Sequence, residues 1–351
     1  MGYPYMEKNH VTKEFWGKKN YPLFTAFLIL LLAVTTFFSL MVGRFDVPPL
    51  EVIAAILSGF IPSPDLSPTV QSVIVDVRLP RVIAVILVGA ALSVAGAAFQ
   101  GLFRNPLVSP DILGVSAGAG FGAAIALLLT ENIFATQVFA FITGIIAVGL
   151  AYGISRVYKV NNTITLVLAG IVVGALFQAL TSLVKYVADP LNKLPAIVFW
   201  LMGSFNHVSN QDLVVAAPIL LAGIGILYLI RWRINVLSMG EEDAKSLGVN
   251  IEHLKVIIIV SATVISAASV SICGIVGWIG LVIPHAGRIF VGPDHKLLIP
   301  VAALIGASYL LMVDTVARTV TMTEIPIGII TALIGAPVFA YLLMKTQAGW
   351  R

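Results

Sequence analysis

Two stretches of sequence decide the fold of this chain: LVVAAPILLAGIGILYLI (residues 213–230) and VIIIVSATVISAASVSIC (residues 256–273). Each contains eighteen residues and no charged side chain. At about 1.5 Å of rise per residue, an α-helix of this length reaches across most of the roughly 30 Å hydrocarbon core of a bilayer. Both stretches are therefore candidate membrane-spanning helices.

The composition extends this interpretation to the whole chain. Of its 351 residues, 59% are hydrophobic and only 11% are charged, whereas a soluble domain carries roughly 25% charged residues. The mean hydropathy is +1.00. We therefore expect an all-α, polytopic membrane protein. The net charge of +4 then indicates basic loops beside lipid headgroups, and not binding to nucleic acid.

Apolar runs of similar length recur outward from the first two. They give about ten predicted spans, at residues 23–42, 82–103, 112–129, 134–154, 164–183, 213–230, 256–273, 274–291, 297–313 and 325–343. Two further apolar segments, 51–60 and 195–205, are too short to span. We expect those two to lie at the membrane surface or among the other helices.

The basic residues predict the orientation. With the N-terminus in the cytoplasm and ten alternating spans, fifteen of the 21 Lys and Arg residues fall on the cytoplasmic side. The positive-inside rule expects this bias. We therefore predict that both termini are cytoplasmic, that residues 1–20 form a cytoplasmic N-terminal tail, and that residues 21–346 form a single transmembrane domain.

A short acidic segment, GEEDAKSLGVN (residues 240–250), separates the two stretches quoted first. Ser238 and Glu241 fit the S-x-x-E capping box of a helix start. Gly248 is placed to end that helix, and Asn250 to cap a second short one. The pattern therefore predicts two short helices at the cytoplasmic face, within about 238–253. The alternative is a solvated loop whose charges only keep it in water.

The linker between the second and third predicted spans is rich in proline and small residues: RNPLVSPDILGVSAGAG (residues 104–120). A helix entered through Pro106 and Pro110 can begin inside the membrane, where irregular backbone must be buried in protein or line a water-filled cavity. The alternative is close helix packing through small residues. Similar glycine- and proline-containing stretches follow residue 274 and residue 324, which suggests a weak internal repeat.

Several classes of site are not predicted. The five histidines show no metal-ligand spacing, and the single cysteine excludes an intrachain disulfide. The sequence contains no G-x-x-x-x-G-K-[ST] motif, so we expect no ATPase site and no enzyme activity in this chain.

One interpretation is a transport subunit that depends on a separate ATPase. Two alternatives to it stay open. A proton-coupled secondary transporter would need an acid deep in a span, and Asp314 is the candidate. Arg318 follows it by four residues, on the same helix face, so an intrahelical ion pair is the simpler interpretation. An intramembrane enzyme would need a nucleophile and base, or a metal site, within the spans, and the sequence offers neither.

Four long motifs in this chain closely resemble the FecCD family of permeases. They are RLPRVIAVILVGAALSVAGAAFQGLFRNPLVSPDILGVSAGAG (78–120), GEEDAKSLGV (240–249), GIVGWIGLVIPHAGRIFVGPDHKLLIP (274–300) and DTVARTVTMTEIPIGIITALIGAPVF (314–339). The resemblance implies a ten-span permease subunit of an ATP-driven importer in a prokaryotic cytoplasmic membrane. It implies a homodimer, two separate ATPase subunits that bind ATP and Mg²⁺, and an extracytoplasmic substrate-binding protein. It implies no cofactor in this chain itself.

The resemblance also implies roles for individual residues. The segment that seats on the ATPase matches at Gly240, Glu241, Ala244, Leu247 and Gly248. The cytoplasmic gate corresponds to Asn105 and Leu107 in one segment and to Asn162 and Thr163 in a second. At the second segment, the family often has small hydroxyl residues. The arginines that meet acidic residues of the binding protein correspond to Arg78 and Arg318.

The substrate class is implied only broadly. In such permeases it is most commonly a ferric siderophore, then haem or cobalamin, with oxyanions such as molybdate behind. Specificity belongs largely to the separate binding protein.

Overall fold

The computed structural model describes residues 17–58, 66–157 and 163–346, and within these ranges it contains helices and no β-strand. The helices, in chain order, are α1 (Gly17–Met41), α2 (Pro49–Leu57), α3 (Pro68–Ser72), the π-helical turn η1 (Val73–Arg78), α4 (Leu79–Phe103), the 3-10 turn η2 (Pro110–Leu113), α5 (Val115–Leu129), α6 (Ile133–Val157), α7 (Thr163–Val187), α8 (Lys193–Leu201), α9 (Asn210–Leu229), α10 (Arg231–Met239), α11 (Glu241–Ser246), α12 (Ile251–Cys273), α13 (Ile279–Val291), α14 (His295–Thr319) and α15 (Ile327–Thr346).

Seven helical segments of the described chain are long and apolar enough to cross a membrane: Asn20–Met41, Pro68–Phe103, Ile133–Val157, Thr163–Val187, Asn210–Leu229, Ile251–Cys273 and His295–Thr319. The other three predicted spans coincide with shorter apolar helices: Val115–Leu129, Ile279–Val291 and Ile327–Leu342. The all-helical membrane fold is thus confirmed, and seven of the predicted spans are confirmed by length. The two segments predicted as too short to span form the short helices α2 and α8.

The chain ends are only partly described. Residues 1–16 and 347–351 lie outside the described ranges, so the side of the membrane on which the termini lie stays a prediction. Helix α1 already begins at Gly17, inside the predicted tail of residues 1–20.

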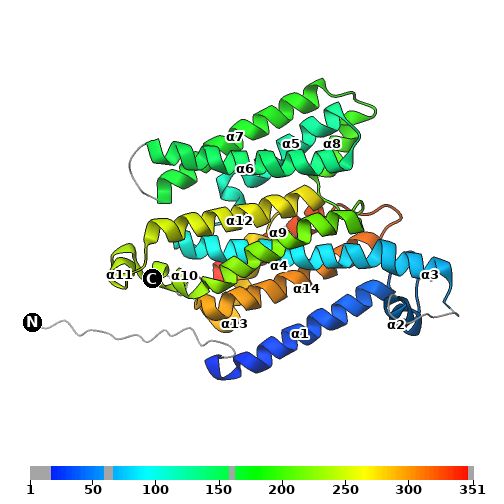
Figure 1. Cartoon of the computed structure of the whole chain (residues 1–351), viewed down its shortest axis with the longest axis horizontal. Coiled ribbons are helices and arrows are strands. Elements are labelled where there is room, and N and C mark those ends of the chain that lie inside the picture. Colours follow the sequence, from blue (N-terminus) through cyan, green and yellow to red (C-terminus); the bar gives the residue numbers. More distant parts are fainter. Residues whose placement is uncertain (1–16, 59–65, 158–162, 347–351) are drawn as a thin grey trace, which may run out of the picture.

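The long helices lie side by side and run in nearly the same direction (Figure 1). Helices α5, α6, α7 and α8 group on one side, α12, α9, α4 and α14 form the middle, and α1 packs on the far side against α14. One end of this bundle carries α10 and α11, and the opposite end carries α2 and α3. We call them the α11 end and the α3 end.

Helix α4 forms the centre of the bundle, in contact with α9, α12, α13 and α14. In the most apolar window of the span that contains it, 78% of the residues are buried, against 22% for α1. Its sequence explains this position, because LVGAALSVAGAAFQG (87–101) presents small residues on every face and lets neighbouring helices approach closely. A Cβ atom placed on Gly96 would lie 1.9 Å from the carbonyl oxygen of Gly280 on α13.

The predicted capping box before α11 is wrong. Ser238 lies inside α10, and its hydroxyl donates to the carbonyl oxygen of Ile234 one turn earlier, 2.9 Å away. A serine can form this bond in a helix interior instead of capping the next helix. The N-cap of α11 is Gly240, which offers no side chain for capping.

The other two signals of this segment are confirmed, with one correction. Gly248 adopts a φ of +76°, the left-handed conformation expected where a glycine ends a helix. Asn250 caps the following helix by accepting the backbone N–H of His253 at 3.1 Å. That helix is not short, however, because α12 continues without a break to Cys273.

Candidate functional site

Helix α11 lies at the extreme end of the bundle, beyond the long helices (Figure 1). Ala244 packs inward and is fully buried, whereas the Leu247 side chain is 62% exposed. Apart from its two chain neighbours, no described residue comes within 4 Å of the position a Cβ of Gly248 would take. Of the predicted coupling residues, Ala244 thus anchors the helix, while the Leu247 side chain and the turn at Gly248 face outward. Gly240 and Glu241 begin the same helix; the Glu241 side chain lies outside the described atoms.

The turn that follows α4 contains Asn105, Pro106 and Leu107, and we call it the N-P-L turn. It is built by local hydrogen bonds. Arg104 ends the helix in the left-handed conformation, with φ of 50°. The backbone N–H of Asn105 donates to the Gln100 carbonyl oxygen at 3.1 Å, and the Asn105 side-chain oxygen accepts the N–H of Leu107 at 2.9 Å. The Leu107 side chain is 50% exposed. The two predicted gate residues of this turn therefore act as one unit, in which Asn105 holds the backbone and Leu107 projects.

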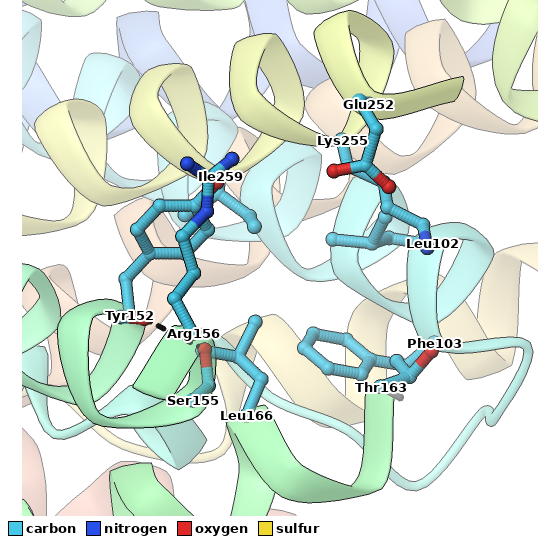
Figure 2. Close-up of a pocket in the computed structure, with 10 residues that line it drawn as sticks. All are labelled: Leu102, Phe103, Tyr152, Ser155, Arg156, Thr163, Leu166, Glu252, Lys255 and Ile259. Carbon is cyan, nitrogen blue, oxygen red and sulfur yellow. Dashed lines mark hydrogen bonds between the residues drawn. The ribbon is translucent and has the colours of Figure 1, made fainter. Parts of the chain in front are cut away.

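A cleft opens beside this turn at the α11 end, between the ends of α4, α6, α7 and α12 (Figure 2). It encloses about 520 Å³, part of which is open solvent. Thr163, the first residue of α7, lines it beside Phe103 of α4, and Leu102 of α4 lines it as well. The structure thus brings this predicted gate residue to the helix end from which the N-P-L turn leaves. Asn162 lies outside the described residues.

The cleft combines apolar and charged walls. Arg156 reaches from α6 toward α12, and its guanidinium lies over the ring of Tyr152 at 5.0 Å. Glu252 and Lys255 line the wall formed by α12.

Arg78 and Arg318 meet at the α3 end, where both hold the C-terminal end of α1. Arg78 donates to the carbonyl oxygens of Leu40 at 2.6 Å and Met41 at 2.9 Å. Arg318 donates to the Val42 carbonyl oxygen at 2.7 Å. The two residues are only 7% and 8% exposed. Basic side chains stabilise a helix C-terminus because its last carbonyls lack partners within the helix.

Arg81 is a site residue that the sequence analysis did not single out. Its guanidinium binds Asp314 through Nε at 3.0 Å and Nη2 at 2.8 Å, and it binds Glu324 through Nη1 at 2.8 Å and Nη2 at 2.9 Å. The predicted pair between Asp314 and Arg318 is present, but at 3.7 Å it is the longer contact. The R-L-P-R motif contains Arg81, yet nothing local indicates that its partners lie more than 230 residues away.

These arginines line a pocket at the α3 end. Its lining includes four arginines and one glutamate: Arg44, Arg78, Arg81, Arg318 and Glu324. The space amounts to about 660 Å³, counting open solvent. We call it the arginine pocket. Its excess of positive charge favours an acidic partner over a basic one.

The described residues offer no group of three or more His, Cys, Asp or Glu side chains arranged to hold a metal ion.

Comparisons with known proteins match nearly the whole chain. The profile of the FecCD transport family matches residues 31–345. The chain is 40% identical to the molybdate import system permease protein MolB of Haemophilus influenzae, over 94% of this chain and 98% of that protein. It is 42% identical to the cobalamin import system permease protein BtuC of Halobacterium salinarum, over 80% of this chain and 75% of that protein. A solved structure described as a metal-chelate type ABC transporter in an inward-facing conformation aligns with a TM-score of 0.83 at 39% identity, over 93% of this chain and 100% of that one.

Proposed function

Because the chain belongs to the FecCD transport family, we propose that it is the permease subunit of an ATP-binding-cassette importer. The observation that carries the proposal is the family match over residues 31–345. The exposed helix α11 supports it, since a subunit without a nucleotide site needs a rigid element through which a separate ATPase can act on it.

The proposal includes a defined assembly. The chain is a multi-pass membrane protein, and we place it in the cytoplasmic membrane of a prokaryote. Residues 21–346 form the permease domain, with ten spans and both termini in the cytoplasm. Two copies of the chain pair around a central pathway, two ATPase subunits bind ATP and Mg²⁺ beneath them, and a substrate-binding protein docks on the outer face.

The α11 end would then face the cytoplasm. There Gly240, Glu241, Ala244, Leu247 and Gly248 form the contact with the ATPase. The exposed Leu247 and the left-handed Gly248 support this role, because they place an apolar side chain on a turn of defined backbone conformation. The gate lies next to it and uses Asn105, Leu107, Asn162 and Thr163.

The α3 end would face outward and receive the binding protein. Arg78 and Arg318 belong to the arginine pocket, and its positive charge supports docking of acidic side chains. Arg44, which is exposed and lines the same pocket, adds a further cation to this surface.

The cargo we propose is a metal chelate, with a ferric siderophore first and haem or cobalamin after it. Molybdate is a second candidate, favoured by the 40% identity to MolB over 94% of this chain. The binding protein decides between them: it should retain its ligand through purification, and elemental analysis together with the absorption spectrum would separate iron chelate, haem, cobalamin and molybdate.

The competing function is a proton-coupled secondary transporter. Buried Asp314 argues against it, because Arg81 and Arg318 both contact the carboxylate that would carry the proton. The test is uptake by reconstituted vesicles that contain the chain, its ATPase and its binding protein. We expect uptake to require ATP on the side of the membrane where the ATPase is bound. Uptake should continue when an uncoupler collapses the proton gradient. Uptake by the permease alone that collapses with the proton gradient would overturn the proposal.

A further inference from the structure

Asn235 joins helix α10 to the start of α14. Its amide nitrogen donates to Oδ1 of Asp294 at 2.5 Å, and its amide oxygen accepts the backbone N–H of His295 at 2.7 Å. Asp294 in turn caps α14 by accepting the N–H of Lys296 at 2.9 Å. Both polar groups of one side chain are thus engaged. Any displacement of α10 must carry the α13–α14 turn with it or break both hydrogen bonds.

The same two elements press on helix α4 at Gly101. A Cβ atom at this position would lie 2.4 Å from Cγ2 of Ile234, the neighbour of Asn235, and 2.6 Å from Nε2 of His295. Ile234 is fully buried. The absence of a side chain at Gly101 therefore lets α10 and α14 contact the last turn of α4 directly.

Gln100, the adjacent residue, connects α4 to the N-P-L turn and to α13. It is 2% exposed. Its amide nitrogen donates to the carbonyl oxygens of Val108 at 3.2 Å and Leu281 at 3.3 Å, and its amide oxygen accepts from Nη1 of Arg288. Its backbone carbonyl accepts the N–H of Asn105 at 3.1 Å. One residue thus holds both ends of the turn that carries Leu107.

These contacts form a continuous path from the α10–α11 segment to the N-P-L turn. We infer that Asn235, Gln100 and Arg288 are positioning residues that transmit a displacement of α10 and α11 to this turn. The inference rests on the proposed function, because it assumes that an ATPase moves α11. Packed side chains and hydrogen bonds can carry coupling between distant sites. The path from Asn235 to Gln100 contains both, because Asn235 binds the start of α14 by hydrogen bonds and Ile234 and His295 pack against Gly101.

The test measures how the turn responds to nucleotide. Cys273 is the only cysteine of the chain, so a Cys273→Ser, Leu107→Cys permease carries a single thiol, on the projecting side chain of the turn. The permease is assembled with its ATPase and binding protein in nanodiscs. The rate of modification of this thiol by a charged maleimide is measured with and without a non-hydrolysable ATP analogue and Mg²⁺. We expect the analogue to change that rate.

Asn235→Ala and Gln100→Met each remove one step of the path. We expect each to shrink the nucleotide-induced change by about fivefold or more, the range typical of coupling between sites, while the ATPase stays bound. Gln137→Met is the matched control, because it likewise removes a side-chain amide hydrogen bond between helices, here the 2.9 Å bond from Gln137 to Asp212 at the α3 end. It should leave the response unchanged. Gln100→Glu keeps an acceptor for Arg288 but loses the donor to Val108. It should shrink the nucleotide response as Gln100→Met does, and it therefore tests the relay even where Gln100→Met folds poorly.

The double variant separates a relay from independent damage. Two steps in series should give an effect no larger than the stronger single variant, whereas independent lesions should multiply. Multiplying effects, or a normal nucleotide response in both single variants, would overturn the relay. A wild-type permease that retains no ATPase and shows no response to nucleotide would overturn the proposed function, and the relay with it.

Discussion

Arg81 binds two carboxylates at the α3 end, those of Asp314 and Glu324. Its side chain is 11% exposed, and its main partner, the Asp314 side chain, is fully buried. Removing one member of a buried ion pair leaves the other charge uncompensated and costs about 3–5 kcal/mol. We therefore expect Arg81→Met to lower the midpoint of thermal unfolding in detergent strongly.

The control for Arg81 is the neighbouring Arg44→Met. Arg44 is exposed and donates to the carbonyl oxygen of Met322, with no other hydrogen bond to the described residues, so its loss should change the midpoint little. Arg81→Lys should fall between the two, because an ammonium group keeps the charge but lacks the planar five-donor fork that binds carboxylates bidentately. Equal midpoints for Arg81→Met and Arg44→Met would show that the buried pair contributes no stability.

The crossing of α4 and α13 depends on the glycine pair Gly96 and Gly280. An added methyl group at Gly96 would lie 1.9 Å from a backbone oxygen, which cannot move aside as a flexible side chain can. Overpacking typically costs about 1–3 kcal/mol, and a backbone obstacle places this site at the upper end. We expect Gly96→Ala to reduce the yield of folded permease and its thermal stability.

Gly153→Ala on α6 is the matched control for that substitution. Gly153 also lies in a helix, but outside that helix's own backbone no described residue comes within 4 Å of the position its Cβ would take. Here alanine should be neutral or stabilising by about 0.5–1 kcal/mol, from helix propensity alone. If both substitutions had the same effect, the helix crossing would not depend on this close approach.

The turn after α11 needs a residue that accepts a positive φ. At Gly248 space is not limiting, since no described residue beyond its two chain neighbours comes within 4 Å of a Cβ there, and the φ of +76° is what opposes a side chain. A β-branched residue is strained there, whereas asparagine tolerates the left-handed region. We expect Gly248→Val to weaken retention of the ATPase and ATP-driven uptake, and Gly248→Asn to preserve both. Retention and uptake that both survive Gly248→Val would remove α11 from the coupling contact.

The proposed docking surface for the binding protein depends on the fold of the whole molecule, because the arginine pocket joins residues from distant parts of the sequence. Arg78 and Arg318 hold the end of α1 by donating to its carbonyl oxygens, so replacing either one would disturb the fold as well as the docking surface. Exposed Arg44 is the cleaner probe of the arginine pocket. We expect Arg44→Glu to slow association with the binding protein, and wild-type association to weaken with added salt, because exposed charges are screened within about 8–10 Å.

The readout for docking is the association rate of the binding protein with the permease in nanodiscs, measured at two ionic strengths. Arg44→Gln, which removes the charge without reversing it, should have a smaller effect than Arg44→Glu. Association that ignores both salt and Arg44→Glu would place the docking surface away from the arginine pocket.

The membrane fold and several turns of this protein could be predicted from sequence because their causes are local. An apolar run of eighteen residues is long enough to span whatever its neighbours are, and the left-handed Gly248 and the Asn250 cap act within four residues. The pairing of Asp314 with Arg318 was predictable for the same reason, since one helical turn brings them together.

The tertiary structure alone decided which side chains meet across the bundle. Arg81 and Asp314 are 233 positions apart, and Gln100 and Arg288 are 188 apart, so no local spacing predicts either contact. The burial of Arg78 and Arg318 depends on where α1 ends, and Ser238 failed as a cap because α10 continues through it. Local patterns set which segments are helical, but the faces on which those helices cross depend on packing among small residues of distant segments, such as Gly96 against Gly280.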